Sequence, residues 1–256
     1  MPNNDYLLVP KINREEMIKA IEVLKDASFG LLLNLVNYQE CIREIIDTFS
    51  LTMKAFEVMD SLAYNQIVLT RPLPIEMVER FEEENINILA EELVADDSSV
   101  GEVIAKCDLD GNLQFEDSVR AFYGGLYNVA ILGFVAVLDK VLSETTGKIN
   151  TINIKKRVDD IKKTINEKGE IFLYSLEGSD AVLINTYIKA FDNFKNESNF
   201  SQTEPDMLNR NWLMHGRTTK KITRMDCVKV LYMIYGTIRM AELGKLDLTS
   251  DSIGSN

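Results

Sequence analysis

EDSVRAFYGGLYNVAILGFVAVLDKVL, residues 116–142, is the stretch that decides the fold class of this chain. Apolar residues cover most sides of a helical projection of this stretch, so it is expected to form one long helix at the centre of a bundle. Gly124 and Gly125 lie inside it, where they either weaken the helix or allow another element to pack closely. The stretch therefore predicts an α-helical core.

The composition of the whole chain agrees with a helical fold. The 256 residues include only 5 prolines and 13 glycines, whereas an all-β protein of this length needs many tight turns. Hydrophobic residues make up 46% of the chain and charged residues 27%, which is typical of a folded, globular protein. We therefore predict an all-α helical bundle.

Apolar residues recur at helical spacing on both sides of the central stretch. Helices are predicted before it over residues 12–26, 29–49, 52–67 and 74–95, and after it over residues 148–168, 179–195 and 225–243. Residues 96–115 are polar and rich in turn formers, so we interpret them as a boundary between two parts. Residues 1–100 are then an N-terminal helical region of unknown role, and residues 116–248 are a second helical domain.

The cysteines and the N-terminus bear on the compartment. Cys41, Cys107 and Cys227 show no paired spacing and there is one histidine, so neither a zinc site nor a disulfide framework is expected. Free thiols suit a reducing cytosol, and the first residues lack the features of a signal peptide. No apolar run approaches the ~20 residues of a membrane-spanning helix. The sequence predicts a cytoplasmic protein without metal, cofactor or membrane contact.

Charge is distributed unevenly along the chain. The formal net charge is −12, which disfavours indiscriminate binding to nucleic acids. Residues 76–117 hold fourteen acidic and two basic residues, so the N-terminal region offers an acidic surface to a protein partner or imitates a nucleic acid. Residues 205–245 hold eight basic and three acidic residues and surround His215, the only histidine. An anionic ligand is expected to be drawn to this basic segment.

Residues 203–216, TEPDMLNRNWLMHG, form the most distinctive segment for chemistry. Thr203 and Asp206 match a capping box, and Gly216 is typical of the position after a helix end, so a helix is predicted over residues 204–215. Arg210 and His215 are then about 140° apart around the helix axis. They converge on one phosphate only if the helix ends or distorts between them, or if a second copy of the chain completes the site.

An arginine and a histidine are a minimal set of groups for cleaving RNA. Histidine titrates near neutral pH and can transfer protons, whereas the arginine fork binds phosphate oxygens and stabilises negative charge. The residues alone leave a second interpretation open, in which His215 only caps the helix and interacts favourably with its C-terminal dipole.

The spacing Arg210-Asn211-x-x-x-His215 resembles the Arg-x(4–6)-His motif of the HEPN superfamily. Residues 208–217, LNRNWLMHGR, are similar to the NRHxxxHG segment of bacterial HEPN-like proteins of defence and toxin–antitoxin type. Asn211 stands where many of those proteins have histidine. The predicted order of helices around the motif also resembles that of the family, and the resemblance covers about residues 116–246.

This resemblance implies an up-and-down helical domain that acts as a dimeric, metal-independent endoribonuclease without a cofactor. The two motifs would face each other across the dimer interface. His215 would transfer protons, Arg210 would stabilise the pentavalent transition state, and Asn211 would orient the phosphate.

Further residues near the motif have two interpretations each. Arg217, Lys220 and Lys221 either hold flanking phosphates of the RNA or are solvated surface charges. Trp212 either stacks on a base or is a buried core residue. The alternative function is a non-catalytic module that keeps a HEPN-like fold and binds a protein or a nucleotide.

Overall fold

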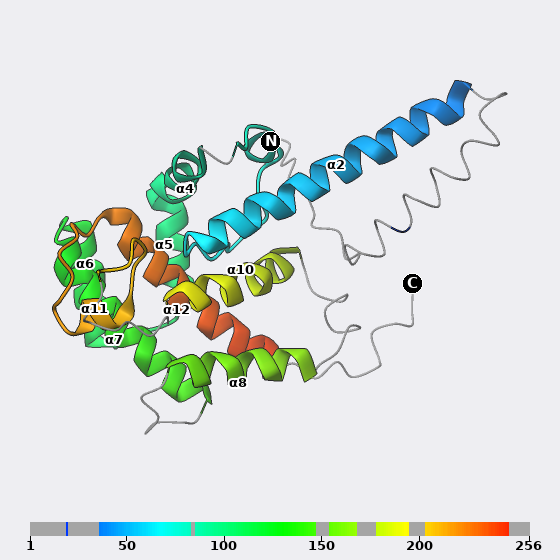
Figure 1. Ribbon diagram of the computed structural model, residues 1–256. Coiled ribbons are helices and arrows are strands. Elements are labelled where there is room, and N and C mark those ends of the chain that lie inside the picture. The colour runs from blue at the N-terminus through cyan, green and yellow to red at the C-terminus, as the bar shows by residue number, and fades with distance from the viewer. Residues whose placement is uncertain are drawn as a thin grey trace.

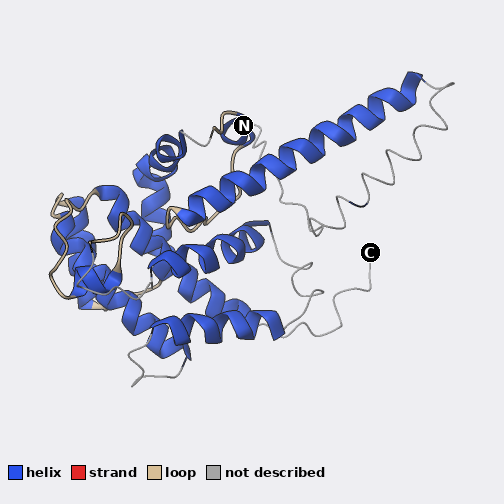
Figure 2. Ribbon diagram, viewed as in Figure 1, coloured by secondary structure: helices blue, strands red, loops and turns tan. Residues whose placement is uncertain are grey.

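The computed structural model describes residue 19 and residues 36–82, 85–146, 154–167, 178–194 and 203–245. These residues form helices joined by loops (Figure 1), and Figure 2 shows no strand among them. The predicted all-α helical bundle is therefore confirmed.

The central stretch forms two helices rather than the single predicted one. α6 spans Leu113–Tyr123 and α7 spans Tyr127–Thr146. Gly125 has a φ of +73°, and the backbone N–H groups of Gly125 and Leu126 donate to carbonyls in the last turn of α6, 3.0 and 2.8 Å away. This is a Schellman helix end, which favours glycine because other residues rarely adopt a positive φ. Gly125 thus ends α6 and turns the chain back along it.

α6 packs directly on α7 at Gly133. A Cβ atom at this position would lie 1.9 Å from Oγ of Ser118, so glycine is what leaves room for α6. Phe115 of α6 and Phe134 of α7 extend this contact, with ring centroids 6.1 Å apart.

α12, Arg224–Lys245, lies at the centre of the bundle and packs most extensively against α7. In Figure 1 it runs among α7, α8 and α10. Its buried residues point to every side of the helix: Cys227, Val228, Val230, Leu231, Tyr232, Met233, Ile234, Gly236, Thr237, Met240 and Leu243. The helix predicted over residues 225–243 is confirmed. The helices predicted over residues 148–168 and 179–195 are also confirmed within the described residues. They are α8, Ile154–Glu167, and α10, Gly178–Phe194.

α2 is one continuous helix over Val36–Tyr64, and the prediction of two helices over residues 29–49 and 52–67 is wrong. The residues at the supposed break include no helix breaker, and the Thr52 hydroxyl donates to the carbonyl of Thr48, 2.8 Å away, within the helix. Val58 and Leu62 are fully buried. Figure 1 shows the first half of α2 extending beyond the other described helices, while its second half joins the bundle.

α3, Ile75–Glu79, and α4, Ile86–Ala95, replace the single helix predicted over residues 74–95. The break is held by the side chain of Asn85, which accepts from the backbone N–H of Glu82 and donates to the carbonyl of Arg80, at 3.1 and 2.8 Å. Such local bonding by asparagine competes with helix formation.

α5, Asp97–Lys106, occupies half of the segment interpreted as a turn-rich boundary. The Asp96 side chain caps α5 by accepting from the backbone N–H groups of Ser98 and Ser99, at 3.0 and 3.1 Å. Residues that favour loops thus begin a helix here. One hydrophobic core runs from α2 to α12, and the division into residues 1–100 and 116–248 stays a prediction.

The structure also bears on the first predicted helix, on the cysteines and on the expected absence of a membrane-spanning helix. The first predicted helix, residues 12–26, lies outside the described residues except for Lys19. Cys107 and Cys227 are buried free thiols, and burial raises the pKa of each to about 12. Among the described residues, no helix is both long and apolar enough to cross a membrane.

Gly236→Ala is expected to destabilise the fold. An added Cβ would lie 2.7 Å from a ring carbon of Tyr187, which is fully buried and cannot move away freely. Gly101→Ala in α5 is the control, since its Cβ would meet only the Tyr123 hydroxyl at 3.7 Å. Both changes gain similar helix propensity, so the difference between their free energies of unfolding isolates the overpacking, about 1–3 kcal/mol. Equal stability in urea unfolding would contradict this packing argument.

Candidate functional site

The helix that carries the candidate residues is shorter than predicted. α11 spans only Arg210–Met214, and residues 203–209 are extended or bent. The cap is Asn209, whose side chain accepts from the backbone N–H groups of Asn211 and Trp212, at 3.0 and 3.3 Å. The predicted helix over residues 204–215, with its capping box at Thr203 and Asp206, is therefore wrong in its first half.

A contact with Gln66, two residues after the end of α2, explains why the chain stays extended before Asn209. The Gln66 side-chain amide is fully buried, accepts from the backbone N–H of Leu208 at 3.0 Å and donates to its carbonyl at 2.7 Å. Both backbone groups of Leu208 are thus satisfied outside a helix. Gln66 itself has a φ of +66°, which non-glycine residues seldom adopt.

A second contact joins residues 203–209 to the loop after α11. The Glu204 carboxylate accepts from the backbone N–H and the hydroxyl of Thr219, both at 2.9 Å, and from the hydroxyl of Thr218. Burial raises the pKa of Glu204, but the bonds from these threonines and the charge of Lys220 outweigh it, so the pKa lies below its ordinary value. The Lys220 ammonium donates to the Pro205 carbonyl. These bonds hold the two segments that flank α11 together.

The C-terminal end of α11 lies where the sequence predicts it. Gly216 has a φ of +64°, and the N–H groups of Gly216 and Arg217 donate to the carbonyls of Leu213 and Trp212, at 3.0 and 2.9 Å. This is the same Schellman ending as at Gly125. His215 is the C-cap residue and is exposed. The helix therefore stops at the histidine.

Arg210, the first residue of α11, pairs with Asp139 of α7. Its Nε lies 2.9 and 3.1 Å from the two carboxylate oxygens of Asp139, and its Nη2 also donates to that carboxylate. Its Nη1 lies 3.3 Å from Oδ1 of Asn211. The two side chains of the ion pair are 19% and 23% exposed, so water is largely kept from them. The fold thus brings Arg210 and Asn211 together and fixes the guanidinium against α7.

Arg210 and His215 stand at opposite ends of α11, about 7.5 Å apart along its axis. The first is held in a charge-assisted pair and the second is accessible to solvent. This arrangement can place a positive charge and a proton-transfer group at two points of one extended anion or across two copies of the helix.

The remaining candidate residues differ in their surroundings. Arg217 and Lys221 are exposed, whereas Lys220 is partly buried and bonded to Pro205. Trp212 is buried, which agrees with its interpretation as a core residue. Other basic residues of the segment take part in ion pairs elsewhere, such as Arg224 with Asp97. The local positive excess that could act on a ligand is therefore smaller than the sequence suggests.

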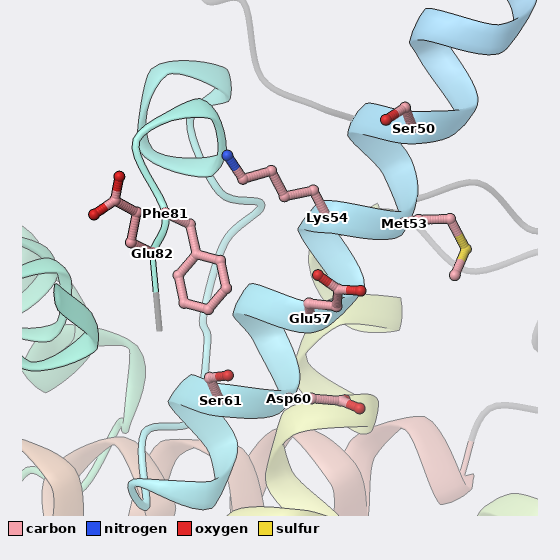
Figure 3. A pocket seen from close by; sticks show the side chains of 8 residues that line it. All are labelled: Ser50, Met53, Lys54, Glu57, Asp60, Ser61, Phe81 and Glu82. Carbon is pink, nitrogen blue, oxygen red and sulfur yellow. The ribbon is translucent and has the colours of Figure 1, made fainter. Parts of the chain in front are cut away.

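A separate hollow of about 750 Å³ lies between α2 and residues 81–82 (Figure 3). Carboxylates and a single aromatic ring dominate its lining, which consists of Ser50, Met53, Lys54, Glu57, Asp60, Ser61, Phe81 and Glu82. The Lys54 ammonium donates to the carbonyl of Glu79, 2.7 Å away, and Asp60 is paired with Lys189. None of these residues belongs to the Arg210–His215 segment.

Sequence reasoning missed Asp139, Gln66 and Glu204. The sequence does contain a signal that could have identified Asp139. Residues 121–138 contain no charged residue, and Asp139 is the first acid after them on a helix that is mostly buried. No sequence signal indicates the role of Gln66, since its contact with Leu208 spans 142 residues of sequence.

Comparisons with known proteins do not assign this chain to a family. A scan against protein-family models, a search of curated proteins and a search of solved structures each find no match to this chain.

Gln66→Ala is expected to destabilise the protein by about 2–4 kcal/mol, because each buried backbone group left without a partner costs about 1–3 kcal/mol. Gln66→Gly is the matched variant, since glycine loses the same amide but adopts the positive φ freely. Chemical denaturation of both variants separates the loss of the amide's hydrogen bonds from the cost of a positive φ at alanine. A loss below about 0.5 kcal/mol in both would show that the Leu208 contact contributes little.

Proposed function

We propose that this protein is a metal-independent endoribonuclease of HEPN type, acting in the cytoplasm in bacterial defence or as part of a toxin–antitoxin pair. The observation that supports it is one short helix with a fixed, charge-paired Arg210 at its start and an exposed His215 at its end. Asn211 contacts the arginine directly, as expected of a residue that helps to orient a phosphate.

The proposed reaction is an attack of the ribose 2′-hydroxyl on the adjacent phosphate. The new bond joins the 2′-oxygen to phosphorus while the bond from phosphorus to the 5′-oxygen breaks. His215 accepts or donates the protons that leave the 2′-hydroxyl and reach the 5′-oxygen. Arg210 stabilises the charge that develops on the phosphate oxygens. The products are a 2′,3′-cyclic phosphate and a 5′-hydroxyl end. Arg217 and Lys221 hold neighbouring phosphates.

The protein is further proposed to act as a homodimer. Leu126, directly before α7, and Val129 and Leu132 in its first turns are 60%, 60% and 46% exposed and follow one another at three-residue spacing. No charged residue lies between Arg120 and Asp139, so two copies of a chain with net charge −12 can meet here without repulsion between side chains. Asp139, which holds Arg210, lies seven residues after Leu132 and therefore on the same side of α7. A two-fold contact through this face would bring the two α11 helices toward one interface.

The test of the proposed function is RNA cleavage by the purified protein in EDTA. Single-stranded RNA with a radiolabelled 5′ end is expected to be cut, and the 5′ fragments are expected to end in 2′,3′-cyclic phosphate. DNA of the same sequence lacks the 2′-hydroxyl and should stay intact. Absence of RNA cleavage over a broad set of RNAs, or cleavage of the DNA control, would overturn the proposal.

A non-catalytic protein-binding module is the second candidate. It is favoured by the acidic hollow between α2 and residues 81–82, which would suit a basic segment of a partner. Under this alternative, purified protein leaves RNA intact, and Glu57→Lys weakens the partner complex while changes at His215 do not.

A further inference from the structure

Asp139 is the residue through which α7 reaches the candidate site. Its carboxylate bonds to Nε and Nη2 of Arg210, and the ion pair links two elements that are 71 residues apart in sequence. Bidentate pairing fixes the plane of a guanidinium as well as its position. Asp139 therefore decides how Arg210 is oriented.

The pairing determines which donors of Arg210 remain for a ligand. A guanidinium carries five N–H donors, one on Nε and two on each terminal nitrogen. Asp139 takes the edge formed by Nε and Nη2, and Asn211 takes one hydrogen of Nη1. The donors that remain are one hydrogen on Nη1 and one on Nη2, and the edge formed by these two nitrogens faces away from the Asp139 carboxylate.

We infer that Asp139 is a positioning residue in the proposed ribonuclease. By holding Arg210, Asp139 presents the Nη1–Nη2 edge of the guanidinium to the scissile phosphate. This inference rests on the proposed function. Without the carboxylate, the guanidinium is free to rotate, and its Nε–Nη2 edge competes for the same phosphate. A misplacement of about 1 Å in such a group can cost on the order of 10² in rate. Lysine cannot replace Arg210, because one ammonium cannot pair with Asp139 in two contacts and bind the phosphate in the same plane.

The chain offers a matched control for a purely structural role. Arg239 of α12 pairs with Asp180 of α10 in the same bidentate way, with Nε and Nη2 each 2.9 Å from a carboxylate oxygen. Asp180 is buried and, like Asp139, joins two helices of the bundle. Removing either carboxylate breaks one ion pair within the fold, but only Asp139 contacts the residue assigned to the reaction.

The experiment compares Asp139→Asn, Asp139→Glu and Asp180→Asn in steady-state RNA cleavage, with folded fractions from circular dichroism. Asp139→Asn is expected to lower kcat by about 10- to 100-fold with KM changed less than threefold, because the loss falls on the transition state. Asp139→Glu is expected to recover part of the rate. Asp180→Asn is expected to lower the melting temperature and to cleave like the wild type per folded molecule.

The possible outcomes are distinct. If the wild type cleaves RNA and Asp139→Asn keeps the wild-type kcat, the positioning role is wrong while the proposed function stands. Equal losses of kcat per folded molecule in Asp139→Asn and Asp180→Asn also overturn it, because the effect is then structural. If the wild type does not cleave RNA at all, the proposed function fails and the inference falls with it.

Discussion

His215→Ala is expected to lower the rate of RNA cleavage by at least 100-fold while the protein stays folded. General acid–base catalysis contributes about 10²–10⁴ in rate, and His215 is the only histidine of the chain. The side chain is exposed and follows the last helical residue of α11, so alanine fits there without a packing cost. The measurement is the single-turnover cleavage rate at saturating protein, with the melting temperature recorded for the same sample.

His215→Gln is the companion variant, because glutamine keeps a polar side chain of similar reach but cannot act as a general acid or base. Both variants are expected to lose cleavage to the same degree. If His215 only caps the helix, alanine costs some stability, about 0.3–2 kcal/mol, and there is no cleavage activity to lose. A well-folded His215→Ala protein that cleaves RNA at the wild-type rate would refute the catalytic role of this residue.

The two glycine helix ends show what the sequence can and cannot reveal. Gly216 and Gly125 end their helices by the same backbone bonds, with φ values of +64° and +73°. Gly216 follows a short segment and precedes polar residues, so it was predictable as a helix end. Gly125 lies within an apolar run that continues on both sides, and helical periodicity does not reveal a break there. Periodicity thus identifies α6 and α7 as helical without showing that they are two.

The residue at which a helix starts depends on tertiary contacts, which the local sequence does not reveal. Thr203 and Asp206 match a capping box, but Asn209 caps α11, because Gln66 holds the Leu208 backbone in an extended conformation. Asp96 looked like part of a loop and instead begins α5. Capping residues are common, and the one that is used depends on which backbone groups find partners elsewhere in the fold.

The residues of the candidate site could be predicted from the sequence, but the residue that orients Arg210 could not. Arg210, Asn211 and His215 follow from a short motif, and the structure places the first two in contact. The carboxylate that orients Arg210 lies on α7, and no local pattern around residue 210 indicates it. A charged residue at the end of a long uncharged run, such as Asp139, is a signal that could be searched for in other chains.

Charged substitutions on the exposed face of α7 are expected to have the second-largest effect. Val129→Lys would place two lysines near each other at a two-fold contact, because each copy contributes the same patch. An unpaired charge buried in an interface costs about 3–5 kcal/mol, so the dissociation constant should rise more than 100-fold. Light scattering at micromolar concentration should then give the mass of a monomer. Cleavage should fall at least tenfold, since the proposed site needs both copies of α11.

Ile88→Lys is the matched control for this experiment. Ile88 lies on α4 and is 60% exposed, the same fraction as Val129, but it is not on the α7 face. The same lysine introduced there adds one positive charge per chain and should leave both assembly and cleavage unchanged. If the wild type is already a monomer at micromolar concentration, or if the Val129→Lys protein still dimerises and cleaves normally, the α7 face is not the interface. Since Leu132 and Asp139 lie on the same side of α7, loss of this interface would remove the contact that is proposed to bring the two Arg210 side chains together.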